Sequence, residues 1–301
     1  MSRVGITVLN GLKLLVRNKI ITEKFYLSIR FLITFKRPIN WEHPCTLNEK
    51  LQVYKLLIDG QSKYSIAADK LAVREWVSKR ASVLFPHVIF KTTNPKDFQF
   101  EGITQPIVIK ANHGSGWYDI IREPKKIVDW NARREEYTRW LKKDFYHESI
   151  EPQYKNIKPT LFGEEMMIPS DGEDIIDYKF HCINGELAFI HVASDRTGET
   201  KRNFFDAEWN ELDMYWGPVN RSGQPARRRN KTLKKPNTLK QMIEVANTLA
   251  KEFPYVRVDL YTLNDNIYFG ELTFHPGAGL ESFVPEKYDA HYGAMLNLAV
   301  K

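Results

Sequence analysis

Two stretches of the sequence decide how the chain is interpreted: YVRVDLYT at residues 255–262 and IYFGELTF at residues 267–274. Both are rich in β-branched and aromatic residues, which favour strands. The turn formers Asn264, Asp265 and Asn266 separate them. The pair of stretches therefore predicts a β-hairpin.

The polar face of this hairpin carries two acidic residues. Because side chains alternate between the faces of a strand, Asp259 points away from the face of Val258 and Leu260. A three-residue loop at 264–266 places Glu271 directly opposite Asp259, whereas a longer loop would shift the pairing. Facing carboxylates repel unless something neutralises them, and Mg²⁺ prefers one or two carboxylates together with phosphate oxygens. The pair suggests a magnesium site; the alternative is ordinary surface charge.

A second candidate element combines a lysine with a glycine-rich turn. Residues 106–110 (PIVIK) form an apolar strand that ends in Lys110, and residues 111–116 (ANHGSG) follow directly. Glycines let backbone amides approach phosphate oxygens, and lysine supplies a positive charge. The alternative is a plain turn between strands. Further basic residues would bind a triphosphate if the fold brought them together: Lys70, Lys179 and Arg257.

The remaining pattern mixes helices and strands. Thr46-Leu47-Asn48-Glu49 fits a capping box and predicts a helix over 47–58. Helical and alternating periodicities predict the other elements. The chain is therefore expected to mix the two kinds of element, with further helices at about 67–80, 131–144 and 238–252 and further strands near 160–168, 175–183 and 186–193.

Composition limits the class of protein. With 301 residues, 43% of them hydrophobic, the chain can bury a core in two or three packed subdomains. Its two cysteines, Cys45 and Cys182, match no zinc or redox spacing, which favours the cell interior. No stretch reaches the about 18 apolar residues of a membrane span, and no signal peptide stands out. We expect a cytoplasmic protein.

The positive charge is unevenly distributed. The whole chain carries a net charge of +7, and residues 221–235 alone hold seven basic residues and no acid. We interpret this run as a mobile surface loop that attracts an acidic partner or an anionic membrane; the alternative is a solvated loop. Nucleic acid is not expected, because no nucleic-acid-binding motif accompanies the charge.

The first residues form a second basic segment. Residues 2–20 contain no acid, and apolar residues recur at helical spacing, as expected for a basic amphipathic helix. Two interpretations stay open: peripheral contact with the inner face of the membrane, or packing of the helix on its own domain. The apolar residues at helical spacing are Val4, Val8, Leu12 and Leu15.

The order and spacing of these motifs resemble the ATP-grasp superfamily, and within it the TupA-like family, which is linked to teichuronopeptide and other cell-surface polysaccharide synthesis. The resemblance covers about residues 44–298. The matching segments are Asn48-Glu49-Lys50, Asp69-Lys70 with Arg74-Glu75, Val108-Ile109-Lys110 with Asn112-His113-Gly114-Ser115-Gly116, Gly163-Glu164-Glu165, Asp177-Tyr178-Lys179, Arg257-Val258-Asp259, and Gly270-Glu271-Leu272-Thr273 with Pro276-Gly277.

This resemblance implies an ATP-grasp fold, in which two α+β subdomains clamp ATP beside a helix-rich N-terminal region. Residues 1–60 would form that N-terminal region, and residues 61–160 the first part of the ATP-grasp fold with its glycine-rich lid. Residues 161–301 would form the C-terminal subdomain with the metal site and the basic loop 221–235.

The resemblance also implies roles for individual residues. Lysines and the glycine-rich lid would bind the phosphates of ATP, a hinge strand would read adenine, and two basic residues would bind the transferred phosphate. Thr273 stands where superfamily members often have Asn, so it would be a weaker metal ligand or none. The implied nucleotide-binding residues are Lys70, Lys110, His113, Gly114, Ser115, Gly116, Glu164, Glu165, Met166, Met167 and Lys179; the catalytic residues are Lys179 and Arg257; the Mg²⁺ ligands are Asp259, Glu271 and Thr273.

The implied activity is that of an ATP- and Mg²⁺-dependent carboxylate–amine ligase that acts through an acylphosphate. Its expected partners are an acidic, uronic-acid-containing glycan or a lipid-linked precursor, and an amino acid or small amine. Two alternatives stay open: a phosphotransferase acting on a glycan or small molecule, and a non-catalytic nucleotide-binding component of a polysaccharide assembly complex.

Overall fold

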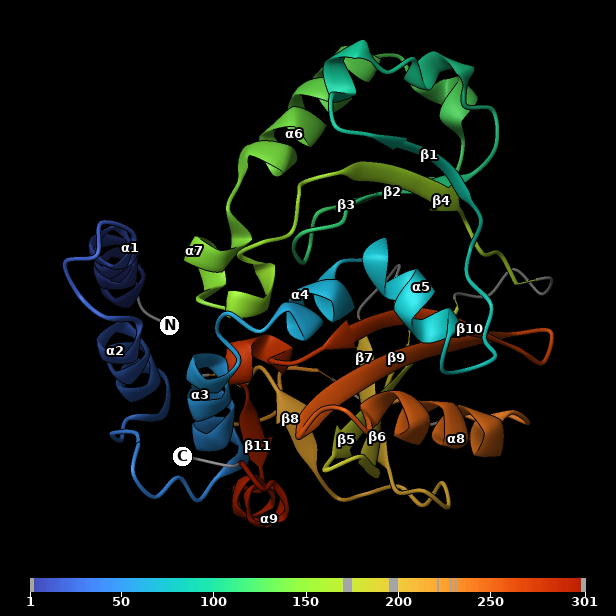
Figure 1. Ribbon diagram of the computed structural model, residues 1–301. Helices are drawn as coiled ribbons and strands as arrows, with labels where there is room; N and C mark the ends of the chain where they lie inside the picture. The colour runs from blue at the N-terminus through green and yellow to red at the C-terminus, as the bar shows by residue number, and fades with distance from the viewer. Residues whose placement is uncertain are drawn as a thin grey trace.

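Two antiparallel sheets of different size organise the chain (Figure 1). The computed structural model describes residues 3–169, 175–194, 200–220, 222–227, 229–230 and 232–298. The small sheet has the strand order β1-β4-β2-β3, formed by Val88–Thr92, Leu161–Glu165, Ile107–Ala111 and Tyr118–Ile121. The large sheet has the order β10-β9-β5-β6-β7, formed by Asn266–Thr273, Tyr255–Leu263, Asp177–Ile183, Glu186–Ser194 and Lys201–Phe205. A short ribbon pairs β8 (Tyr215–Gly217) with β11 (Ser282–Val284).

Helices cover the outer faces of both sheets (Figure 1). Helix α6 (Trp130–Lys142) arches over the small sheet, and α8 (Leu239–Ala250) packs on the large sheet. The short helices α4 (Ser62–Ala68) and α5 (Ala72–Ser78) lie between the sheets, while α1 (Arg3–Arg17) and α2 (Glu23–Phe35) form one flank. The remaining helices are α3 (Leu47–Leu57), α7 (Phe145–Ser149) and α9 (Lys287–Met295), with 3-10 turns η1 (Pro95–Asp97), η2 (Phe100–Gly102), η3 (Pro124–Lys126), η4 (Pro152–Tyr154) and η5 (Pro276–Gly279).

Each sheet has its own hydrophobic core. Strands of the large sheet, α8 and the helices α3, α4 and α5 bury one continuous cluster. The small sheet and α6 bury a second one, which includes Phe100, Trp130 and Leu161. The packing units therefore differ from boundaries at 60 and 160: α3 to α5 pack with the C-terminal half, and β4, which follows residue 160, completes the small sheet. The α+β class is confirmed.

One predicted helix is divided into two. The pattern over 67–80 predicts a single helix, but the chain leaves α4 after Ala68 and resumes as α5 at Ala72. Here the Lys70 amide donates to the carbonyl oxygen of Asn112 (3.3 Å), and Asp69 Oδ1 accepts from the Leu71 amide (2.8 Å). These bonds replace helical ones and hold Lys70 beside the end of β2. The predictions of helices over 47–58, 131–144 and 238–252 are confirmed by α3, α6 and α8.

The hairpin of β9 and β10 has the predicted pairing but a different turn. Asn264 and Asp265 form a two-residue turn with φ of 51° and 57°, which matches the strand twist of a tight hairpin. A two-residue turn alone would pair Gly270 with Asp259. A bulge between Phe269 and Glu271 shifts the register by one residue, and Glu271 then pairs with Asp259. The predicted opposition of the two acids is confirmed; the predicted three-residue loop is wrong.

Close contact between α3 and α9 yields a stability prediction. A Cβ atom added at Gly293 in α9 would lie 2.2 Å from the Cys45 carbonyl oxygen. We expect Gly293→Ala to lower the free energy of unfolding by about 1–3 kcal/mol, because backbone cannot yield to the methyl group. Gly11→Ala in α1 is the matched control: nothing lies within 4 Å, and better helix propensity should stabilise by up to about 1 kcal/mol. Urea unfolding measures both, and equal effects would contradict the proposed contact.

Candidate active site

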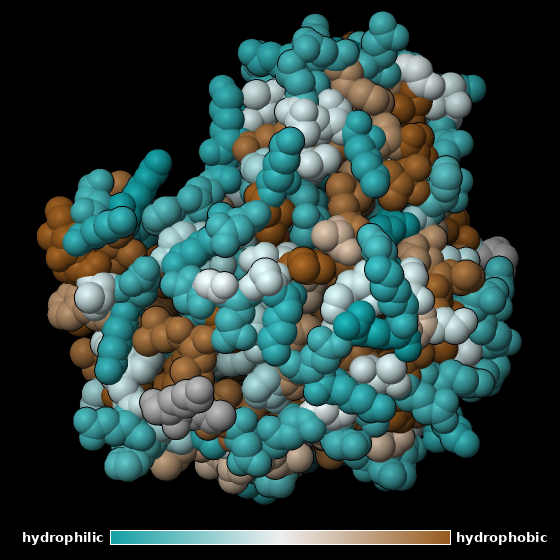
Figure 2. All heavy atoms as spheres, in the orientation of Figure 1, coloured by the Kyte–Doolittle hydropathy of each residue, from teal (hydrophilic) through white to brown (hydrophobic). Residues whose placement is uncertain are grey.

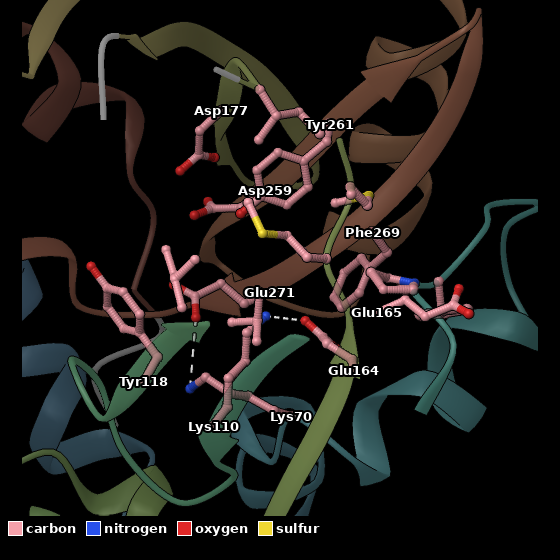
Figure 3. A pocket seen from close by; sticks show the side chains of 18 of the residues that line it. Lys70, Lys110, Tyr118, Glu164, Glu165, Asp177, Asp259, Tyr261, Phe269 and Glu271 are labelled. Carbon is pink, nitrogen blue, oxygen red and sulfur yellow. Dashed lines mark hydrogen bonds and ion pairs between the residues drawn. The ribbon is translucent and has the colours of Figure 1, made fainter. Parts of the chain in front are cut away.

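A cavity of about 340 Å³ lies between the two sheets (Figure 3). Strands β2 and β4 of the small sheet line one side, and strands β5, β9 and β10 of the large sheet line the other. The predicted site residues that line it are Lys70, Lys110, Ser115, Gly116, Glu164, Glu165, Met166, Met167, Lys179, Asp259 and Glu271.

A row of ionisable side chains crosses the large sheet at the cavity. Glu271 pairs with Asp259 across β10 and β9, Asp259 pairs with Lys179 of β5, and Lys179 pairs with His191 of β6. Directly paired residues point to the same face of a sheet, so the four form one line. Lys179 Nζ donates to Asp259 Oδ2 (2.7 Å) and to Asp177 Oδ2 (2.6 Å). The row therefore places two adjacent acids beside a lysine and ends at His191, whose pKa is lowered by burial.

Arg257 joins the two acids of the hairpin. Its Nε and Nη2 donate to Asp259 Oδ1 and Oδ2, both at 2.6 Å, and Nη2 also donates to Glu271 Oε1 (3.1 Å). The hydroxyl of Thr273 donates to the same Glu271 oxygen (3.1 Å). In this arrangement Thr273 orients the carboxylate of Glu271.

The two acids differ in their electrostatic environment. Burial raises the pKa of Asp259, which is only 1% exposed, while Arg257 and Lys179 act in the opposite direction. For Glu271, burial is also the largest influence, but Lys70, Arg257 and Lys179 together outweigh it and lower the pKa to about 2. Glu271 is thus a stable negative charge on the wall of the cavity at neutral pH.

Lys70 connects the two sheets. Its Nζ donates to the carbonyl oxygen of Gly114 (2.5 Å), in the turn after β2, and lies 3.7 Å from Glu271 Oε2 on the large sheet (Figure 3). Burial lowers the pKa of Lys70, and Glu271 opposes that shift. The break between α4 and α5 therefore places a cation between the glycine-rich turn and the hairpin acids.

Glu164 of β4 holds one cation from the small sheet and one from α5. Its carboxylate pairs with Lys110 (Figure 3), and its Oε2 lies 3.4 Å from Arg74 Nη1. Glu164 is 6% exposed, whereas Glu165 is exposed at the edge of the cavity. The amides of Glu165 and Met166 donate to His87 O (2.9 Å) and Pro106 O (3.4 Å). The side chain of Glu164 thus positions Lys110, and Glu165 is the more accessible acid for a ligand.

The glycine-rich turn has an exposed and a buried half. Ser115 and Gly116 line the cavity, and Gly116 needs its positive φ of 79°. His113 is buried, its Nε2 lies 3.3 Å from the Lys143 carbonyl oxygen, and its ring centroid lies 5.0 Å from that of Trp117. Burial lowers the pKa of His113. The neutral His113 therefore packs at the back of the turn. Gly114 packs there as well, since a Cβ atom added to it would lie 2.7 Å from the Trp117 ring.

Several cavity residues were not assigned a role from the sequence. Asp177 lies two residues before Lys179, so strand periodicity places both on one face. Arg74 lies four residues after Lys70. Because this spacing is common on surface helices, it did not indicate a role for Arg74. The apolar and aromatic lining gave no sequence signal, because its members look like core residues: Phe85, Tyr118, Tyr261 and Phe269.

The hairpin acids fit a particular kind of magnesium site. Among the described residues, no group of three or more His, Cys, Asp or Glu is arranged to hold a metal ion by itself. Asp259 and Glu271 face each other, and both contact the cation Arg257. Because Mg²⁺ is often bound by one or two carboxylates plus phosphate oxygens, this donor set fits an ion that is shared with a bound phosphate group.

Part of the basic run 221–235 contacts β7 and the segment after it through hydrogen bonds and ion pairs. Arg229 forms ion pairs with Glu211 (3.3 Å) and Asp213 (3.4 Å). Asn230 and Asn203 of β7 exchange hydrogen bonds of 2.8 and 3.0 Å. Its residues Arg221, Arg228 and Lys231 lie outside the described residues. An acidic partner for this run stays a prediction.

A family model described as TupA-like ATPgrasp matches residues 49–297. Similar solved structures include D-alanine-D-alanine ligase from Helicobacter pylori, with 12% identity, a TM-score of 0.39 and coverage of 77% of this chain and 62% of that chain. D-alanine–D-alanine ligase from Bacillus anthracis complexed with ATP shows 14% identity, a TM-score of 0.40 and coverage of 69% and 55%.

A further similar structure is the macrocyclase MdnC bound with precursor peptide MdnA from Microcystis aeruginosa MRC, with 14% identity, a TM-score of 0.34 and coverage of 92% of this chain and 72% of that chain. The chain spans less than two thirds of the length of the two ligases, 62% and 55%. A search of the curated proteins found no match.

Proposed function

Because the chain belongs to the TupA-like ATP-grasp family, we propose that it is an ATP- and Mg²⁺-dependent ligase that joins a carboxylate to an amine. The observation that carries this proposal is the meeting of cations from both sheets in one cavity, beside a facing pair of acids. Lys110 comes from β2 of the small sheet, Lys70 from the break between α4 and α5, and Lys179 from the large sheet, where it lies next to Asp259 and in one row with Glu271.

The chemistry of amide formation explains why such a site needs charge. A carboxylate does not react with an amine at neutral pH, so one of its oxygens first attacks the γ-phosphorus of ATP and ADP leaves. The amine then attacks the carbonyl carbon of the acylphosphate, loses a proton, and releases inorganic phosphate. Phosphoryl transfer of this kind depends on positioning and on charge neutralisation. No nucleophilic side chain is required.

Different residues at the site have different roles in this reaction. Lys70 and Lys110 would hold the phosphates of ATP, with Ser115 and Gly116 above them. Asp259 and Glu271 would hold Mg²⁺, which when bound supplies positive charge to the phosphate oxygens. Two further cations lie along the polar row of the large sheet, where they would stabilise the transferred phosphoryl group: Lys179 and Arg257.

We place the acidic acceptor further along the same face of the large sheet. Arg202 of β7 pairs with Ala193, which pairs with Asp177, so Arg202 shares the face of the cavity residues. Its guanidinium donates to the Trp216 carbonyl oxygen (2.9 Å) and lies only loosely, at 3.4 Å, against the carboxylate of Glu281. Both side chains are about one fifth exposed, 19% and 21%. An incoming carboxylate could therefore replace Glu281 as the partner of Arg202.

Arg202→Lys tests this placement. We expect KM for the acidic acceptor to rise about 10- to 100-fold, because lysine cannot form two parallel bonds to a carboxylate. The dissociation constant for ATP should stay within about twofold, since the acceptor is a separate ligand. Arg133→Lys is the control, because Arg133 pairs with Asp119 outside the cavity lining. An unchanged acceptor KM would place the acceptor elsewhere.

The proposed acceptor is a uronic-acid-containing glycan or its lipid-linked precursor, and the proposed amine is an amino acid, short peptide or small amine. A screen of amino acids against uronic-acid glycans tests this, with ADP, phosphate and product mass measured together. Equal amounts of ADP, phosphate and amide support the ligase. A phosphorylated acceptor without free phosphate would identify a phosphotransferase, and tight ATP binding without ADP under every mixture would identify a binding protein.

We place the activity on the cytoplasmic side of the membrane, where ATP is available. Within the part of the chain that the structure describes, no helix is long and apolar enough to cross a bilayer. Fractionation of cells that produce the tagged protein checks the location. Recovery of the protein outside the cytoplasmic and membrane fractions would contradict it.

A further inference from the structure

An exposed apolar face lies on the N-terminal helices, away from the cavity. We define it by five large apolar side chains: Val8 and Leu14 of α1, Ile20 of the link, and Phe25 and Leu32 of α2. They are 45%, 59%, 66%, 49% and 43% exposed. Figure 2 shows hydrophobic residues gathered at the left edge of the molecule, where Figure 1 places α1 and α2. The cavity does not use any of these five residues.

Helices α1 and α2 contact the rest of the protein through residues other than these five. Helix α1 buries Leu9 and Val16, and α2 buries Tyr26 and Leu27, in one small core that they share with α7. The stripe over 2–20 predicted from the sequence includes Val8, and the structure leaves Val8 in solvent. Each helix therefore has apolar residues on its packed side and on its outer side. Contiguous exposed apolar surface of this kind marks an interaction site.

The segment that carries the apolar face is also rich in positive charge. Residues 7–37 contain seven basic residues and one acidic residue. That acid, Glu23, accepts a hydrogen bond from the Tyr146 hydroxyl (2.6 Å) and is only partly exposed. Among the seven basic residues, four are exposed: Arg17, Lys19, Lys24 and Lys36. The face thus combines apolar side chains with a strong excess of exposed cations.

We propose that α1 and α2 bind an anionic membrane surface, with the five apolar side chains in the lipid interface and Arg17 and the exposed lysines at the headgroups. Amphipathic helices of this composition lie in the plane of the interface. A second copy of the chain fits less well, because a two-fold dimer would bring the same basic face against itself. The proposal does not depend on the ligase activity.

Flotation of the full chain with lipid vesicles tests the proposal. We expect it to float with vesicles of phosphatidylcholine and phosphatidylglycerol in equal parts and to remain unbound with phosphatidylcholine alone. Raised salt should weaken the binding, since the attraction to headgroups is screened. Equal binding to both vesicle types, or none to either, would overturn the proposal.

Two variants separate the apolar and electrostatic contributions. Leu14→Ser with Phe25→Ser should weaken vesicle binding at least tenfold, because two large apolar side chains no longer enter the interface. Arg17→Gln with Lys19→Gln should weaken it about 25-fold, at about fivefold for each lost charge. All four residues are exposed, so the fold and ATP binding should be kept.

Val128→Ser is the matched control, because Val128 is fully exposed but lies outside this face. It should leave vesicle binding unchanged. If Leu14→Ser with Phe25→Ser binds vesicles as the parent does, the apolar face is not the contact. If the parent is a dimer in solution and the same variant is a monomer, the face binds a second copy and the membrane proposal fails.

Discussion

Asp259→Asn is expected to lower ATP turnover by about 10³-fold or more and the free energy of unfolding by about 3–5 kcal/mol. The carboxylate is 1% exposed and accepts two hydrogen bonds from Arg257 and one from Lys179. An amide of the same shape carries no charge, so each buried cation loses one counterion: Lys179 keeps Asp177, and Arg257 keeps Glu271. The turnover falls because an Mg²⁺ ligand is lost and because Lys179 and Arg257 lose their positions.

The measurement pairs ADP release with urea unfolding. Asp119→Asn is the matched control: Asp119 accepts from Arg133 and from the Tyr137 hydroxyl, both at 2.7 Å, outside the cavity lining. We expect it to reduce stability and leave turnover per folded molecule unchanged. If Asp259→Asn turns over ATP like the parent, the assignment of the hairpin as the metal and phosphate site is wrong.

Glu271→Gln is expected to lower turnover by about 10²–10³-fold with a much smaller loss of stability. Glu271 is 34% exposed on its side chain, so water screens its ion pairs with Lys70 and Arg257. Glu271 therefore contributes mainly to the binding of the metal ion and the phosphates, and less to stability. The Mg²⁺ concentration at half-maximal turnover should rise, because one of the two carboxylates no longer attracts the cation.

The pH dependence gives a separate check of Glu271. Its pKa of about 2, below its usual 4.5, means that the ionised form is favoured in the folded protein. The stability it contributes is present above pH 4.5 and is lost as pH falls toward 2. We expect Glu271→Gln to reduce activity by a similar factor throughout pH 5 to 8. A loss confined to the upper part of that range would show that Glu271 titrates there and would contradict its low pKa.

Local regularities explain what could be predicted around the hairpin. Strand alternation places Asp259 on the face opposite Val258, and turn residues mark where the chain reverses. The pairing of Asp259 with Glu271 followed from these rules, although the turn and the bulge at Gly270 differ from the simple loop that was expected. The observed turn is one residue shorter than predicted, and the bulge adds one residue to β10. The two differences cancel, so the predicted pairing is still correct.

Longer-range contacts explain what could not be predicted. The pattern over 67–80 has helical periodicity, yet two hydrogen bonds with Asn112 interrupt the helix: the Lys70 amide donates to the Asn112 carbonyl oxygen, and Asp69 accepts from the Asn112 side chain. The same applies to α1, whose sequence shows an amphipathic helix but not which side meets the protein. Asn112 follows Asp69 by 43 residues along the chain, and α7, which shares the small core of α1, lies in a distant part of the sequence.

The sequence by itself determined the mixture of helices and strands, the β9–β10 hairpin with the face that carries Asp259, the capped helix at Thr46, and the excess of basic residues at 2–20 and 221–235. These depend on neighbours within a few positions, where backbone geometry leaves little choice. Only the tertiary structure decided that Lys70, Lys110 and Lys179 line one cavity, that Arg257 contacts the two acids of its wall, and that Glu164 holds Lys110. Those contacts join strands of two sheets, and which strands pack face to face depends on burial over the whole chain rather than on any local pattern.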